Sequence, residues 1–198
     1  MILKHRPKIA LMIAIVFFGS LAFGQGGSVT IGIHQDITNF DPRIGNDVTS
    51  VFVNQLLYSS LVRISDELTI EPDLAESWET PSPTEYVFHL RKGVKFHDGE
   101  DLTASDVKYT YDSMRDPSLG SPNLSLYGEV ESIDVIDDYT VRFSLSEPFP
   151  PLLYYLDKGI VPEHIASKER NALNVEPIGS GPYALKSWNA NDRIVLSA

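Results

Sequence analysis

Short stretches in which every second residue is apolar recur along this 198-residue chain, and they limit the folds open to it. In residues 85–91, Tyr86, Phe88 and Leu90 occupy alternate positions, as in a β-strand that buries one face. A chain with many such segments must build at least one sheet that is covered on one side. Strands are also expected at residues 28–34, 61–70 (with a turn at 65–67), 94–96 after a turn at Gly93, 130–136, 139–146, 183–188 and 193–196.

Helical spacing interrupts these strands at two places. Val107, Tyr111 and Met114 follow a helical period behind Thr103 and Asp106, which resemble a capping box. A second helix is predicted from about residue 47, with Asn46 or Asp47 as its cap, and a helical turn over residues 152–156. Residues 171–178 are expected to form a loop. The fold class is therefore α+β or mixed α/β.

The first 24 residues differ in character from the rest. Lys4 and Arg6 begin a basic segment, residues 9–18 are continuously apolar, and the small residues Ala22 and Gly24 precede Gln25. This arrangement predicts a secretory signal peptide over residues 1–24. An uncleaved membrane anchor is the alternative, but the apolar stretch falls short of the roughly 20 residues that a spanning helix needs. We expect export to a periplasm.

Composition excludes several classes of protein. The chain has 0 Cys, which leaves no disulfide framework, no thiolate zinc site, no cysteine nucleophile and no cysteine for a lipid anchor. Its 27 Asp and Glu residues against 16 Lys and Arg residues give a net charge of −11. Nucleic-acid binding depends on cationic side chains that neutralise phosphates, so no nucleic-acid partner is expected.

Catalytic motifs are missing from the sequence. It contains no nucleophile elbow, no metalloprotease motif, no phosphate-binding P-loop and no dinucleotide fingerprint. Ser180 lies between Gly179 and Gly181 just before a predicted strand, where a tight turn is the simpler interpretation. The chain is therefore predicted not to be an enzyme. A secreted or periplasmic hydrolase stays as an alternative, and it would need a convergent Ser/His/Asp set or carboxylate pair.

Two histidines near an acidic residue raise the question of a metal site. His97 and Asp98 are adjacent, and His89 lies on the preceding strand. Metal ligands usually come at tighter spacing or converge from several elements. The pattern favours a hydrogen-bonded turn at residues 97–100, and we predict no metal and no cofactor.

Several stretches, taken in their order along the chain, resemble the extracellular solute-binding proteins of family 5, the peptide- and nickel-binding receptors of ATP-driven (ABC) importers. Each stretch is short, but their common order covers residues 28–198. They are residues 39–42 (NFDP), 74–79 (LAESWE), 86–99 (YVFHLRKGVKFHDG), 102–107 (LTASDV), 137–143 (DDYTVRF), 145–149 (LSEPF) and 179–183 (GSGPY).

The resemblance implies a periplasmic-binding-protein-like clamshell that closes on a solute between two lobes and then docks on a membrane permease. Residues 25–198 look like the N-terminal part of this domain, with a smaller inserted domain at residues 58–162 within an incomplete first lobe. Family members continue into a second lobe, so this chain is expected to be a fragment that binds no peptide alone.

The most favoured ligand class is an oligopeptide or dipeptide, with nickel or a metal chelate, heme and oligosaccharides left open. A complete protein of this kind is expected to be a monomer. A standalone interaction or sensor module derived from the same fold is the other alternative.

The resemblance implies ligand contacts at only a few positions of this chain. The segment after the Asp-Pro turn lines the cleft in peptide-binding relatives, and an aromatic residue follows a Ser-Pro pair in some of them. Here that aromatic position holds Asn123, which departs from the pattern. The implied ligand residues are Asn46, Asp47, Val48, Thr49, Asn123 and, as a wall, Tyr127. The competing interpretation is that Asn46 and Asp47 only cap a helix.

Overall fold

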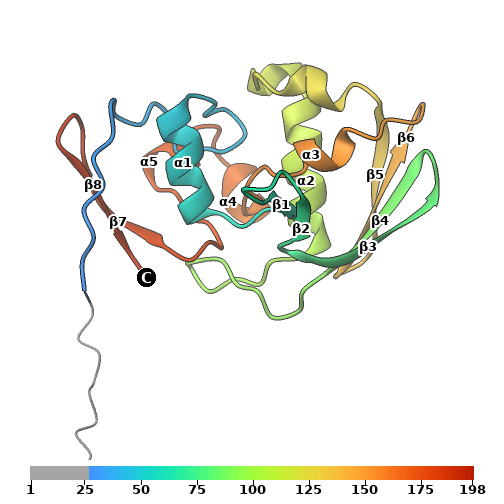
Figure 1. Ribbon diagram of the computed structural model, residues 1–198, viewed down its shortest axis with the longest axis horizontal. Coiled ribbons are helices and arrows are strands. Elements are labelled where there is room, and N and C mark those ends of the chain that lie inside the picture. Colours follow the sequence, from blue (N-terminus) through green and yellow to red (C-terminus); the bar gives the residue numbers. More distant parts are fainter. Residues whose placement is uncertain (1–26) are drawn as a thin grey trace, which may run out of the picture. The chain divides into compact units, whose positions relative to one another are not determined.

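The computed structural model describes residues 27–198, which are shown in Figure 1. The predicted signal peptide, residues 1–24, lies outside the described residues. The chain divides into two units between Gly32 and Ile33, and the account below concerns residues 33–198 unless stated otherwise. Within the described part of the chain, none of the helices combines the length and apolar character needed to cross a membrane.

A four-stranded antiparallel sheet is the largest sheet among the described residues, with strand order β3-β4-β6-β5. Tyr86, Phe88 and Leu90 of β4 are all buried, which confirms the predicted inward face of this strand. Cross-strand pairing sets Phe88 opposite Val141 of β6. The strands are β3 (Ala75–Ser82), β4 (Glu85–Leu90), β5 (Val130–Asp137) and β6 (Thr140–Leu145).

Helix α2 (Ala104–Arg115) packs on this sheet against β5 and β6 (Figure 1). Its N-terminus carries the predicted capping box, in which Asp106 accepts from the backbone N–H of Thr103. On its inner face, the ring of Tyr111 meets that of Phe143 edge-on at 5.4 Å. Such aromatic pairs contribute about 0.5–1.5 kcal/mol beyond the area they bury.

Two antiparallel hairpins and several short helices complete the fold. The hairpins are β1 (Val62–Ile64) with β2 (Ile70–Pro72), and β7 (Ala184–Asn189) with β8 (Arg193–Ser197). The remaining helices are α1 (Val48–Leu57), α3 (Leu152–Tyr155), α4 (Glu163–Ala166) and α5 (Ala172–Val175), with 3-10 turns η1 (Pro117–Leu119) and η2 (Leu124–Tyr127).

Buried apolar side chains form two clusters. One cluster has its fully buried members between Leu61 and Ile160, and it contains the sheet and the inner face of α2. The other takes its members from Ile37 to Tyr58 and then from Val161 to Leu173. The chain passes between the clusters close to the limits predicted for the inserted domain, residues 58–162, and that domain assignment stays a prediction.

The structure contradicts several sequence predictions. No strand is assigned to residues 28–34, and Val29, Ile31 and Ile33 are exposed. An alternating pattern shows which face a strand would bury, but a strand forms only where another strand supplies hydrogen bonds. The second strand predicted after Gly93 is reduced to an isolated bridge between Lys95 and Asp101.

Several further elements were not expected from the sequence, among them α5 and β3. Residues 171–178 contain the helical turn α5 rather than only a loop. Strand β3 was missed because its residues are mostly polar and exposed, so it lacks the alternation that marks β4. It is identified as a strand by its pairing with β4, in which Trp78 lies opposite Phe88.

Candidate functional site

Asp47 caps helix α1, as one of the two predicted capping residues. Its carboxylate accepts hydrogen bonds from the backbone N–H and hydroxyl of Ser50, the hydroxyl of Thr38 and the side-chain amide of Gln35. Partial burial raises the pKa of Asp47, but these hydrogen bonds outweigh it and hold that pKa well below its ordinary value. The carboxylate is therefore committed to the fold of its own segment.

The neighbours of Asp47 include both exposed side chains and one that is buried and hydrogen-bonded. Thr49 is buried and donates its hydroxyl to the carbonyl of Gln35 at 3.2 Å. Asn46 is exposed, and Val48 has 85% of its surface exposed. Of the four residues predicted around the start of α1, only Asn46 and Val48 therefore present open side chains.

The structure brings the Asp-Pro turn next to the Ser-Pro segment, although they are far apart in sequence. The hydroxyl of Ser121 donates to the carbonyl of Arg43 at 2.6 Å and accepts from the backbone N–H of Asn123 at 3.2 Å. Asn123 is half-buried, and the hydroxyl of Ser121 links it to the loop that leads into α1. The two segments implied by the resemblance share one region of the fold.

Tyr127 has a different environment from the predicted wall. It is 1% exposed, its hydroxyl donates to the carbonyl of Tyr155 at 2.8 Å, and its ring meets that of Tyr111 edge-on. Burial raises the pKa of the Tyr127 hydroxyl. In the described structure this side chain is part of the hydrophobic core rather than an open surface.

A pocket of about 430 Å³ lies along the later turns of α1. We call it the α1 pocket. On one side it is lined by the helix and its C-cap through Val51, Asn54, Gln55 and Tyr58. The opposite lining comes from distant parts of the chain: Pro42, Ser59, Ser60, Arg63, Ile64, Asp73, Asp157, Lys158, Gly159 and Pro182.

Three residues that line the α1 pocket carry a buried polar atom without a hydrogen-bond partner in the protein. They are Asn54 and Tyr58, through Oδ1 and the hydroxyl, and Asp157, whose Oδ1 has only its ion pair with Lys158. Asn54 and Tyr58 are both less than 5% exposed. Burial raises the pKa of the Tyr58 hydroxyl far above its ordinary value, so this group is a donor and not an anion. An unsatisfied buried polar group costs about 1–3 kcal/mol, so a polar solute or water that bonds to it gains that much.

Charges of both signs surround the α1 pocket. Lys158 and Asp157 form an ion pair at 3.1 Å, and the carboxylate of Asp73 accepts from the backbone N–H of Ser60 at 2.8 Å. Arg63, which is largely exposed, pairs with Glu71 at 2.5 Å. A pocket with buried hydrogen-bonding groups and both charges at its walls suits a small polar solute that carries both charges itself.

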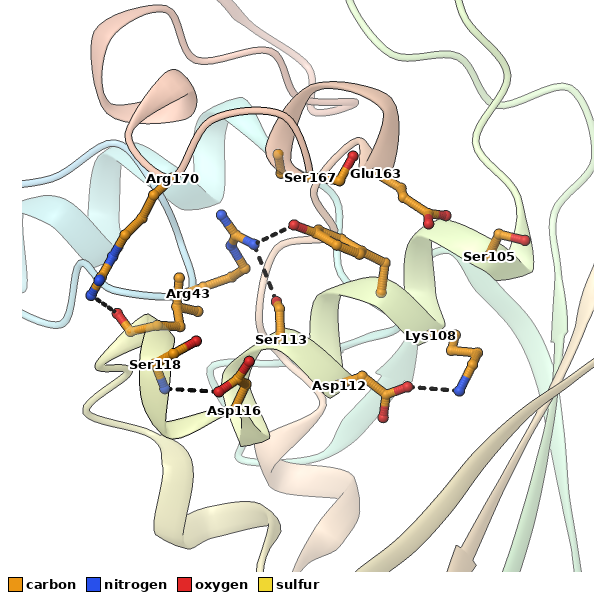
Figure 2. A pocket seen from close by; sticks show the side chains of 13 residues that line it. Arg43, Ser105, Lys108, Asp112, Ser113, Asp116, Ser118, Glu163, Ser167 and Arg170 are labelled. Carbon is orange, nitrogen blue, oxygen red and sulfur yellow. Dashed lines mark hydrogen bonds and ion pairs between the residues drawn. The ribbon is translucent and has the colours of Figure 1, made fainter.

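A larger pocket of about 700 Å³ lies against α2, η1 and α4, and Figure 2 shows its lining. Several of its charged groups already have partners within the protein. The Nη1 atom of the buried Arg43 donates to the hydroxyls of Ser113 at 3.2 Å and Tyr109 at 3.4 Å, and Lys108 pairs with Asp112 at 2.7 Å. Among the described residues, none that lines this larger pocket has a buried side-chain polar atom without a partner, so we prefer the α1 pocket as the candidate site.

His97 and Ser180, which sequence reasoning considered as a metal ligand and a nucleophile, both have a structural role. His97 bonds through both ring nitrogens to the backbone of Gly179 and Gly181. Ser180, between those glycines, accepts at its carbonyl from the hydroxyl of Ser59. Across residues 27–198, no three or more His, Asp or Glu side chains are grouped so as to hold a metal ion.

Sequence reasoning missed the residues of the α1 pocket. Asn54 and Tyr58 are one helical turn apart on a face that otherwise packs in the core, and this polar pair was the available signal. Lys158 gave no signal, because its place beside α1 depends on the course of the chain over more than 100 residues.

The sequence is similar to a family model and to proteins of known function. Residues 69–198 match the family model described as "Bacterial extracellular solute-binding proteins, family 5 Middle". The glutathione-binding protein GsiB of Escherichia coli K12 is 31% identical over 193 residues, which cover 95% of this chain and 38% of that protein. The chain therefore spans little more than a third of this curated relative.

Solved structures give the same relationship. The oligopeptide-binding protein AppA from Bacillus subtilis, in complex with a nonapeptide, is 32% identical with a TM-score of 0.76, over 83% of this chain and 34% of that one. NikZ from Campylobacter jejuni, in complex with Ni(L-His), is 27% identical with a TM-score of 0.78, over 84% of this chain and 34% of that one.

Proposed function

This chain belongs to the bacterial extracellular solute-binding proteins of family 5, and we propose that it is part of an ABC-importer receptor that binds short peptides and delivers them to a membrane permease. The receptor is proposed to bind its solute without transforming it. In this proposal the protein is exported by the signal peptide of residues 1–24, works in the periplasm as a monomer, and meets the permease after closing on its solute.

The observation that carries the proposal is the α1 pocket. A peptide backbone offers both an N–H that can donate to Asn54 Oδ1 and a carbonyl that can accept from the Tyr58 hydroxyl. A short peptide also carries an ammonium and a carboxylate, which would bind Asp157 and Lys158 in exchange for the ion pair that these two residues form with each other. A sugar would use the hydrogen-bonding groups but not the charges, and an apolar ligand would use neither.

The relatives support this ligand class in different ways. GsiB is named for glutathione, and the AppA structure contains a nonapeptide, so both names describe peptide chemistry. The NikZ structure contains nickel with L-histidine, a ligand that also carries the ammonium and carboxylate of an amino acid. Amino-acid termini are the chemistry common to these three relatives.

Isothermal titration calorimetry of the full-length protein tests the proposal, with a dipeptide, a tripeptide, glutathione and Ni(L-His) as titrants. We expect saturable binding of at least one peptide. Lys158→Gln should weaken it about five- to tenfold through loss of a charge-assisted hydrogen bond. Lys168→Gln, an exposed position outside both pockets, is the matched control and should bind as the unaltered protein does.

Two results would reject the proposal. One is the absence of peptide binding by a protein that melts cooperatively. The other is equal affinity in the Lys158→Gln and Lys168→Gln variants, which would place the solute away from the α1 pocket.

A further inference from the structure

We propose that His97 is a positioning residue of the α1 pocket, and that it holds the segment 179–182 in place only while its imidazole is neutral. The pocket's role as a solute site rests on the proposed function above. The latch itself, which is His97 with the backbone of Gly179 and Gly181, can be tested without any solute.

Three hydrogen bonds join His97 to this segment. The backbone N–H of His97 donates to the carbonyl of Gly179 at 2.8 Å. The Nδ1 atom of its ring accepts from the backbone N–H of Gly179 at 3.2 Å, and Nε2 lies 3.1 Å from the carbonyl oxygen of Gly181. One side chain therefore bonds to two peptide groups that are 82 and 84 residues further along the chain.

The same segment lies directly against the end of α1. The N–H of Gly181 donates to the carbonyl of Leu57 at 2.9 Å, and the next residue, Pro182, lines the α1 pocket. A Cβ atom at Gly179 would lie 1.9 Å from the oxygen of Leu57, and one at Gly181 would lie 2.7 Å from the nitrogen of Tyr58. Only glycine allows this approach, and a displacement of the segment would move Pro182, which is part of the pocket wall.

The bonding pattern specifies the protonation state of His97. A carbonyl oxygen can only accept, so Nε2 must carry a proton, and an N–H can only donate, so Nδ1 must not. The ring is therefore the neutral Nε2–H tautomer. A protonated imidazole carries N–H groups on both nitrogens, so the bond from Gly179 is lost and two donors face each other.

The charged side chains near the turn at residues 97–100 respond to acid differently from His97. Lys95 and Asp101 pair at 2.6 Å, and His164 of α4 lies 2.8 Å from Asp98. Protonation of His164 strengthens its pair with Asp98 rather than breaking it. Glu100 lies in the same turn, and residues 179–182 contribute no titratable side chain. Protonation of the His97 ring, by contrast, removes the acceptor that the latch needs.

The first experiment measures the latch in the full-length protein by nitrogen-15 NMR. At neutral pH we expect the ring shifts of the Nε2–H tautomer for His97 and slow solvent exchange of the Gly179 amide. As the ring is protonated, that amide should become at least about threefold less protected, in line with one lost hydrogen bond. The latch would be disproved by an Nδ1–H tautomer of His97, or by a Gly179 amide whose exchange rate does not change when His97 is protonated.

The second experiment follows glutathione or dipeptide affinity between pH 8 and pH 5. The unaltered protein should lose about three- to tenfold in affinity as His97 is protonated, the value of one hydrogen bond. In His97→Asn, an amide oxygen replaces Nδ1 as the acceptor, and the asparagine side chain does not titrate. The affinity of this variant should therefore not fall between pH 8 and pH 5. His97→Gln, which restores only the donor near Gly181, should bind weakly at every pH. His34→Asn, a substitution of an exposed histidine, should keep the unaltered profile.

These outcomes separate the two proposals. If no peptide binds at any pH while NMR shows the latch, the proposed function fails and the latch stands. If peptide binds and His97→Asn keeps the pH step of the unaltered protein, the positioning role of His97 is overturned. If His97→Asn does not fold, the comparison of the unaltered protein with His34→Asn and the NMR titration still decide.

Discussion

The Nη2 atom of Arg43 lies 2.6 Å from Oδ2 of Asp41, and both side chains are only 2% exposed. This buried ion pair closes the Asp-Pro turn that leads into α1. Its remaining donors reach α2 through Ser113 and Tyr109. Although desolvation lowers it, hydrogen bonding and charge attraction from Asp41 raise the pKa of Arg43, so the guanidinium stays charged. A turn held by such a pair keeps the start of α1 against the rest of the fold.

Removal of one partner of this pair should be more costly than removal of both. Arg43→Met leaves the Asp41 carboxylate buried without its counter-charge, and we expect a loss of about 3–5 kcal/mol in the free energy of unfolding. The double variant Asp41→Leu/Arg43→Met should lose less, because no uncompensated charge remains. Urea unfolding of the two variants measures the difference. A double variant at least as unstable as the single one would contradict the expectation.

Asp47 should make stability depend on pH at the acidic end. Its folded pKa is lowered, so its contribution is present above the pKa of about 4 of an unfolded aspartate and is lost as pH falls through the folded value. At pH 7, Asp47→Ala should cost about 1–2 kcal/mol through loss of the cap. The difference from the unaltered protein should narrow at pH 3. Urea unfolding at both pH values tests this, and a gap that widens in acid would contradict it.

Gly179 should not tolerate a side chain. A Cβ atom there would lie 1.9 Å from the carbonyl oxygen of Leu57, so Gly179→Ala must shift backbone. We expect a loss of about 1–3 kcal/mol in thermal unfolding measurements. Gly128→Ala is the control, because its Cβ would meet nothing closer than 3.6 Å and its φ of −58° suits any residue. Equal melting of the two variants would contradict the close approach to α1.

The two members of the α2 capping box should differ in importance. The carboxylate of Asp106 accepts from the backbone N–H of Thr103 and also from that of Glu163, at the start of α4. Asp106→Ala should therefore destabilise by more than Thr103→Ala, for which about 1 kcal/mol is expected. Hydrogen exchange at the Glu163 amide should increase only in the first variant. Increased exchange in both would mean that α4 follows α2 as a whole.

Several features were predictable from the sequence because neighbours in the chain determine them. The inward face of β4, the capping box at Thr103 and the cap at Asp47 each depend on residues within a few positions of one another. The order of the short motifs likewise indicated the family, and the family match over residues 69–198 confirms that resemblance. The ligand contacts suggested at Asn46, Asp47, Val48, Thr49 and Asn123 stay predictions.

The sequence by itself determined the strand and helix periods, the caps and the family, since these follow from backbone geometry and local hydrogen bonds. Only the tertiary structure decided which polar groups lack partners and which meet across the fold. Tyr127 is in the core, residues 28–34 form no strand, and His97 binds a segment more than 80 residues away. Burial and long-range hydrogen bonds depend on the course of the whole chain, so no local pattern specifies them.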